Sequence, residues 1–115
     1  MDIEAVKRIL IQWAATKPLV GRLWIFGSRA RQDYRPDSDL DIAIELDLAV
    51  ANNFDKSGGL LTWSLVEKGW AEEIHQLAGL PIDLNQYLRD FVLSDIPEKV
   101  AKSNILVFAK PQLSC

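Results

Sequence analysis

The segment from Asp39 to Leu46 alternates between two kinds of side chain. Its apolar members are Leu40, Ile42, Ile44 and Leu46, whereas Asp39 and Asp41 occupy alternate positions between them. Successive side chains of a strand point to opposite faces, so this pattern predicts a half-buried strand with an acidic face. A rise of about 3.3 Å per residue separates the two carboxylates by roughly 6 to 7 Å. Such a pair can converge on hard cations such as Mg²⁺, which prefer oxygen ligands.

A short apolar run, Leu23 to Phe26, precedes this segment and ends at Gly27-Ser28. A continuous apolar run that stops at a glycine is typical of a buried strand that leads into a turn. Gly27 would allow close approach of the backbone, and Ser28 could offer its hydroxyl and N–H to phosphate oxygens near the start of a helix. The turn therefore predicts a phosphate-binding site.

The remaining pattern predicts a single domain over residues 1–115, an α/β fold with a small mixed sheet flanked by helices. Asp83 occupies the middle of a short predicted strand and is the third candidate carboxylate. Helices are predicted from Ile3 to about Lys17, with Asp2 as N-cap, and over residues 28–32, 60–77 and 96–102. Further strands are predicted over 82–84 and 105–108, and the second of these is either an edge strand or a segment packed on the core. Residues 33–38 and 52–59 are predicted to be connections.

Composition narrows the range of partners. A net charge of −3 and a pI near 5.1 argue against stable DNA or RNA binding, which usually needs a basic surface. The N-terminus does not resemble a signal peptide, and no apolar run is long enough to cross a bilayer. We therefore expect a cytoplasmic protein without a membrane partner. Cys115 is assigned no role, because nothing near it in the sequence would lower its pKa.

Gly27-Ser28, ten residues and then Asp39-Leu40-Asp41 resemble the signature of the polymerase-beta-like nucleotidyltransferase superfamily. The segment is most similar to the minimal nucleotidyltransferases (MNT) that are paired with HEPN proteins in prokaryotic toxin–antitoxin systems. The specific part of the resemblance runs from Phe26 to Glu45, with Asp83 as a weaker third anchor. Gln32 departs from the family, since many relatives have glycine there, and this puts the local turn geometry in question.

The resemblance implies a nucleotidyltransferase that transfers AMP from ATP to a hydroxyl, expected to be a tyrosine, of a HEPN toxin. The protein would then be an enzymatic antitoxin that forms a hetero-oligomer with its partner. Asp39, Asp41 and Asp83 would be the catalytic and metal-binding residues for two Mg²⁺ ions. Gly27, Ser28 and Arg29 would bind the nucleotide.

Other interpretations remain open at the level of sequence. The chain could neutralise a HEPN RNase by direct binding, with a weak or vestigial nucleotide site, or it could modify a small molecule such as an aminoglycoside. Asp83 could face solvent on an edge strand, and Glu45 could tune the site or be a solvated carboxylate. Arg29, Arg31 and Arg35 could meet phosphate or be surface charges. His75 is expected at the surface and the four tryptophans in the core, although an exposed one could anchor a partner.

Overall fold

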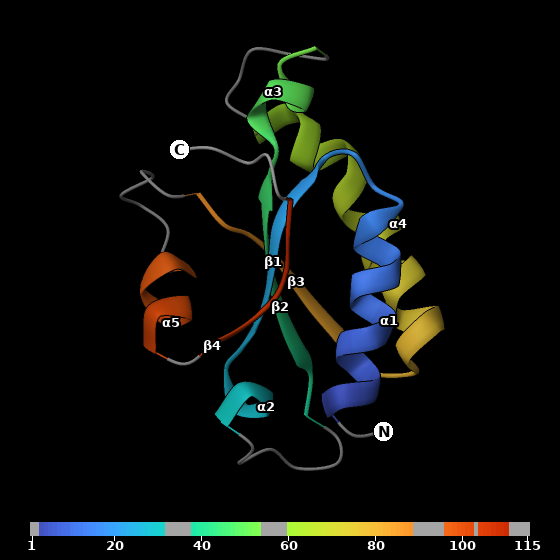
Figure 1. Cartoon of the computed structure of the whole chain (residues 1–115), viewed down its shortest axis with the longest axis vertical. Helices are drawn as coiled ribbons and strands as arrows, with labels where there is room; N and C mark the ends of the chain where they lie inside the picture. Colours follow the sequence, from blue (N-terminus) through green and yellow to red (C-terminus); the bar gives the residue numbers. More distant parts are fainter. Residues whose placement is uncertain (1–2, 32–37, 54–59, 89–95, 103, 111–115) are drawn as a thin grey trace.

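The structure is a computed structural model that describes residues 3–31, 38–53, 60–88, 96–102 and 104–110. Helices and strands alternate along most of the chain (Figure 1). In chain order the elements are α1 (Ile3–Ala15), β1 (Val20–Phe26), α2 (Ser28–Arg31), β2 (Leu40–Leu46), α3 (Leu48–Ala51), α4 (Leu60–Ala78), β3 (Ile82–Gln86), α5 (Ile96–Lys102) and β4 (Asn104–Ala109). Among the described residues, no helix is long and apolar enough to span a membrane.

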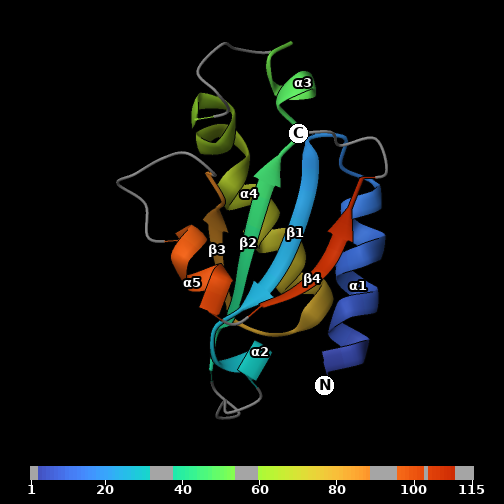
Figure 2. The ribbon, with the colours of Figure 1, turned by 60° about the vertical axis from the view of Figure 1, so that its left-hand side comes forward.

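The four strands form one mixed sheet in the order β3-β2-β1-β4 (Figure 2). β1 is antiparallel to both of its neighbours, whereas β2 and β3 are parallel. Parallel neighbours need a long crossover connection, and α4 lies within the connection from β2 to β3. Backbone hydrogen bonds from the Leu40 N–H to the Pro81 carbonyl and from the Tyr87 N–H to the Ile44 carbonyl, both 2.8 Å, lie at the two ends of the pairing. The predicted mixed sheet flanked by helices is therefore confirmed.

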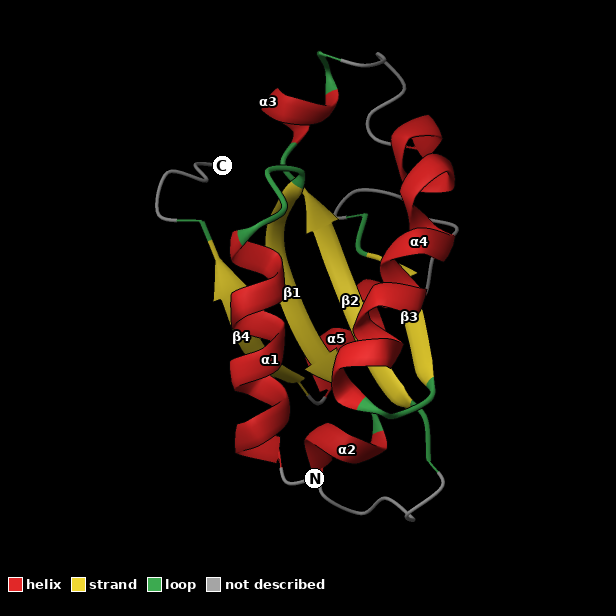
Figure 3. Cartoon of the chain, turned by 90° about the vertical axis from the view of Figure 1, so that its right-hand side faces the viewer, coloured by secondary structure: helices red, strands yellow, loops and turns green. Residues whose placement is uncertain are grey.

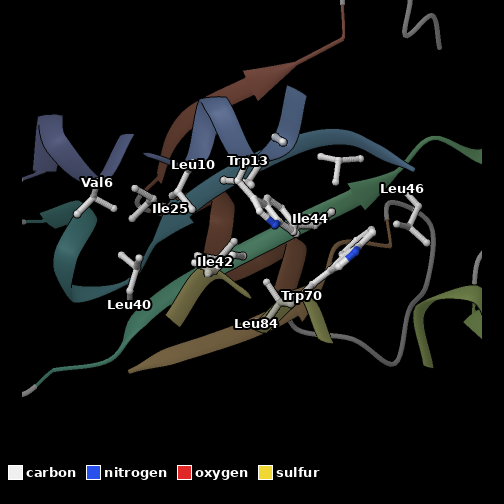
Figure 4. Packing of buried hydrophobic residues seen from close by; sticks show 14 of the residues in the cluster. Val6, Leu10, Trp13, Ile25, Leu40, Ile42, Ile44, Leu46, Trp70 and Leu84 are labelled. Atoms are coloured by element: carbon white, nitrogen blue, oxygen red, sulfur yellow. The ribbon is translucent and has the colours of Figure 1, made fainter. Parts of the chain in front are cut away.

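The main core lies between one face of the sheet and helices α1 and α4 (Figure 3). The predicted apolar face of β2 points into it, where Leu40, Ile42 and Ile44 are completely buried. Figure 4 shows Leu40 below Val6 and Ile42 below Leu10 of α1, with Trp70 of α4 near Ile44. The Trp70 ring lies edge-on to Trp13, with ring centroids 5.4 Å apart, so aromatic packing joins the two helices.

The opposite face carries a smaller apolar cluster under α5. Phe26, Ala43 and Val100 are buried there, and Trp24 packs against the ring of Tyr87 at a centroid distance of 4.5 Å. Three of the four tryptophans are therefore in the main core as predicted, while Trp24 is half-buried on the other face. This second face is also the acidic face of β2.

Element boundaries differ from the sequence prediction in a few places. β1 begins at Val20 rather than Leu23, and β3 continues beyond Leu84 to Gln86. The short helix α3 was not predicted; the Asp47 carboxylate caps it by accepting from the Ala49 N–H at 3.1 Å. The 105–108 run lies in the edge strand β4, one of the two alternatives given for it. The proposed N-cap Asp2, Gln32, Arg35 and Cys115 lie outside the described residues.

The turn after β1 depends on glycine for two separate reasons. Gly27 has a φ of +73°, which side-chain-bearing residues rarely adopt. A Cβ at this position would also overlap the Oδ2 atom of Asp41 on β2 and lie 3.2 Å from its Cγ. The absence of a side chain at Gly27 therefore creates the space that the Asp41 carboxylate occupies.

We expect Ile44→Ala to lower the free energy of unfolding by about 2–5 kcal/mol, because it removes a fully buried side chain and leaves a cavity. Leu65→Ala is the matched control, since Leu65 on α4 is 77% exposed and its removal should change stability by no more than about 0.5 kcal/mol. Urea unfolding of both variants measures the difference. Similar losses for the two would contradict the described core.

Gly27→Ala should cost more stability than Gly79→Ala, although both residues have similar positive φ values of 73° and 70°. At Gly79 a Cβ meets nothing within 4 Å, so its substitution costs only the backbone strain, about 1–2 kcal/mol. At Gly27 the Asp41 side chain must also move. Urea unfolding gives the two costs, and a crystal structure of Gly27→Ala shows the rotamer of Asp41; equal costs with Asp41 in place would refute the proposed overlap.

Candidate active site

Asp41 lies at the centre of the candidate site. It is on β2, between Phe26 of β1 on one side and Asp83 of β3 on the other, and both are its register partners in the sheet. The parallel pairing therefore brings together two carboxylates that are separated by more than forty residues in the sequence. Asp83 is exposed on the edge strand β3, as one of the two interpretations of the sequence held, but it also lies next to Asp41.

The two carboxyl groups interact directly. Burial, a hydrogen bond with Asp83 and the negative charges of Asp83 and Asp39 together raise the pKa of Asp41 from 3.8 to about 6. The positive charge of Lys99 on α5 acts in the opposite direction. Charge on Asp41 is thus costly in the free protein, and a cation at this point would relieve that cost.

Asp39 precedes β2 by one residue and is exposed. Its negative charge contributes to the raised pKa of Asp41, so Asp39 is close enough to influence the ionisation of that carboxyl group. Among the described residues, however, no three His, Cys, Asp or Glu side chains are grouped closely enough to hold a metal ion. The oxygen-only donor set suits Mg²⁺, but metal binding by Asp39, Asp41 and Asp83 stays a prediction.

The Gly27-Ser28-Arg29 segment forms the turn into α2. Ser28 is the first residue of that helix, and Arg29 is only 5% exposed. The Arg29 guanidinium donates from Nε and Nη2 to the Ser38 carbonyl, at 3.2 and 2.8 Å. Arg29 thereby ties α2 to the residue just before Asp39, a positioning role that the sequence did not indicate. Its predicted contact with nucleotide is untested.

A cavity of about 270 Å³ opens beside Asp41, close to the lower limit of volumes common for small-molecule sites. Three of the predicted site residues line it, namely Gly27, Asp41 and Asp83. Its other lining residues are Phe26, Arg31, Asn85, Ile96 and Lys99.

Sequence reasoning did not assign four of these lining residues to the site, namely Phe26, Asn85, Ile96 and Lys99. Asn85 had a usable signal, because it follows Asp83 by two positions and so shares its face of the strand. Ile96 and Lys99 had none, since only the tertiary position of α5 brings them to the cavity.

Two other residues considered in the sequence analysis, Glu45 and His75, make contacts outside the candidate site. Glu45 forms an ion pair with Arg22, its partner on β1, which accounts for its carboxylate without the site. His75 is exposed, as expected, and its Nδ1 lies 2.7 Å from the Leu80 carbonyl beyond the end of α4.

The family model described as polymerase beta, nucleotidyltransferase matches residues 9–112. None of the curated proteins matches the chain. Among solved structures, a chain of a toxin–antitoxin complex with AMP-PNP has a TM-score of 0.61 at 19% identity, over 92% of this chain and 75% of that chain.

Two further structures are similar to this chain. A mutant of the toxin–antitoxin pair MntA-HpeT gives a TM-score of 0.57 at 17% identity, over 97% of this chain and 77% of that chain. A complex of tri-AMPylated Shewanella oneidensis HEPN toxin with MNT antitoxin gives 0.52 at 18% identity, over 97% of this chain and 76% of that chain. At these identities the likeness establishes a common fold. Because the family model covers most of the sequence, including Gly27-Ser28 and all three carboxylates, the chain belongs to the polymerase beta nucleotidyltransferase family.

Proposed function

We propose that this protein transfers AMP from ATP to a hydroxyl group of a HEPN toxin and thereby acts as its antitoxin in the cytoplasm. The observation that carries the proposal is the contact of Asp41 with Asp83 in a cavity beside Gly27, within a nucleotidyltransferase family. The structural neighbours supply the acceptor class, since one of them is a tri-AMPylated HEPN toxin bound to its MNT antitoxin.

In the proposed reaction the acceptor oxygen forms a bond to the α-phosphorus of ATP. The bond from this phosphorus to the oxygen that bridges the α- and β-phosphates breaks, and pyrophosphate leaves. Asp39, Asp41 and Asp83 would hold Mg²⁺, which when bound neutralises phosphate charge and favours ionisation of the acceptor hydroxyl. Asp83 is exposed on β3 and is the candidate to accept the hydroxyl proton. Gly27 keeps space for Asp41, and Ser28 offers its hydroxyl and N–H to the phosphates.

In this proposal the acceptor hydroxyl belongs to a separate protein chain. The cavity is small, and its lining residues lie on β1, β2, β3, α2 and α5 and at the Gly27 turn. A HEPN partner that presents a tyrosine would complete the site, which agrees with the toxin–antitoxin complexes among the structural neighbours. Blocking of the toxin by contact alone is the competing proposal.

Intact mass of the HEPN partner, measured after incubation with this protein, Mg²⁺ and ATP, distinguishes the two. We expect a gain of one or more AMP units with the parent protein and none with Asp41→Asn, because that substitution removes a carboxylate while it keeps the shape of the side chain. Glu45→Gln is the matched control, since Glu45 is paired with Arg22 and should be dispensable for transfer. A stable complex and an inhibited toxin without any mass gain would replace the transferase proposal by direct binding.

Asp41→Asn should also stabilise the protein at pH 7 in buffer without divalent ions. The folded-state pKa of about 6 lies above the ordinary 3.8, so the stability linked to protonated Asp41 is complete below 3.8 and is lost as the pH rises through 6. The advantage of the neutral amide should therefore be largest at pH 7 and shrink towards pH 4. Urea unfolding at both pH values measures it.

Asp47→Asn provides a control of opposite sign. An ion pair with Lys110, at 2.8 Å, lowers the pKa of Asp47, so its ionised form stabilises the fold above the ordinary pKa and this benefit is lost as the pH falls. Asp47→Asn should destabilise the protein at pH 7 by less than about 1 kcal/mol, because the pair is near the surface. If both variants responded to pH in the same direction, the assigned environment of Asp41 would be wrong.

A further inference from the structure

The cavity beside Asp41 is lined by groups of opposite charge from different elements. The carboxylates Asp41 and Asp83 belong to β2 and β3, whereas the cations Arg31 and Lys99 belong to α2 and α5. Figure 2 shows both helices near the end of β1, where the turn at Gly27 begins. A metal–nucleotide complex has the same division of charge, because its cation needs carboxylates and its phosphate oxygens need cationic donors.

The backbone position of Lys99 is well fixed. Val100 is buried with Phe26 and Ala43, and the half-buried Ile96 packs against the same cluster, so one side of α5 is held on the sheet. The carbonyl of the same Val100 also accepts a hydrogen bond from the Asn104 side chain of β4, whose Nδ2 donates at 2.6 Å. Lys99 lies between these anchors, and its exposed side chain reaches the cavity on a long flexible stem.

The positive charge of Lys99 favours the ionised form of Asp41, so its effect is felt inside the site. Its effect on Asp41 opposes the combined effects of burial and of two neighbouring carboxylates. If the cavity had no cationic side chains, the negative charges of Asp41 and Asp83 would repel a polyphosphate bound beside them. Arg31 shares this task, because it lines the same cavity from the last position of α2.

We infer that Lys99, assisted by Arg31, binds the phosphates of the donor nucleotide and so makes the site selective for a nucleoside triphosphate over the nucleoside. This inference rests on the proposed nucleotidyl transfer. It assigns α5, a helix outside the Gly-Ser and Asp-x-Asp signature, to donor binding. Lys99 would bind phosphate oxygens through its ammonium group, so a positive charge is required at this position.

The test is the affinity for AMP-PNP with Mg²⁺, compared with the affinity for adenosine, measured on the full chain by calorimetry and by ligand-observed NMR. We expect Lys99→Met to weaken AMP-PNP binding about tenfold, the effect of one charge-assisted hydrogen bond, and to leave adenosine binding unchanged. Lys99→Arg should bind AMP-PNP within about threefold of the parent, because it keeps the charge.

Lys68→Met is the matched control. It makes the same change at an exposed lysine of α4, which covers the opposite face of the sheet, and should leave both affinities unchanged. The inference is overturned if Lys99→Met binds AMP-PNP like the parent, or if its binding of adenosine falls equally, since the latter indicates a structural role. Failure of the parent to bind AMP-PNP overturns both this inference and the proposed transfer. Lys99-dependent binding without modification of a HEPN partner overturns the transfer alone.

Discussion

The candidate site depends on the parallel pairing of β2 with β3. This pairing places Asp83 directly opposite Asp41, and no local segment of the chain could do so. The pairing requires a connection from β2 to β3 that contains α4 and covers one face of the sheet. The tryptophans of α4 are buried there against the apolar face of β2. The burial that stabilises the fold and the register that assembles the acidic site are therefore consequences of one connection. A shift of β3 by one residue would turn Asp83 to the other face.

The local elements could be predicted from sequence because each has its own periodic signal. Alternation defined β2, the apolar run before Gly27 defined β1, and the helical spacing of apolar residues defined α1. The acidic pair and the Gly-Ser turn could also be predicted, since both lie within a short segment at a fixed spacing. These local signals do not show which strands pair with each other. The proximity of Asp41 and Asp83 was therefore expected from the family resemblance and not from periodicity.

The parts that were missed are tertiary in origin. Arg29 carries the same charge as an ordinary surface arginine, and only the folded chain shows it buried against the Ser38 carbonyl. Lys99 belongs to a helix whose place over the acidic face is set by packing of Val100, which the sequence does not encode as a pattern. The helix α3 is only one turn long, too short for an apolar period to mark it, although its N-cap Asp47 was a usable signal.

The overlap between a side chain at position 27 and the Asp41 carboxylate also has an evolutionary consequence. Because the two residues compete for one volume, they cannot vary independently while the backbone keeps this turn. A lineage that lost the acidic group at position 41 would be released from part of the constraint on glycine at position 27, and only the positive φ would still favour it. Joint change at these two positions would therefore mark descendants that have kept the fold but abandoned the chemistry.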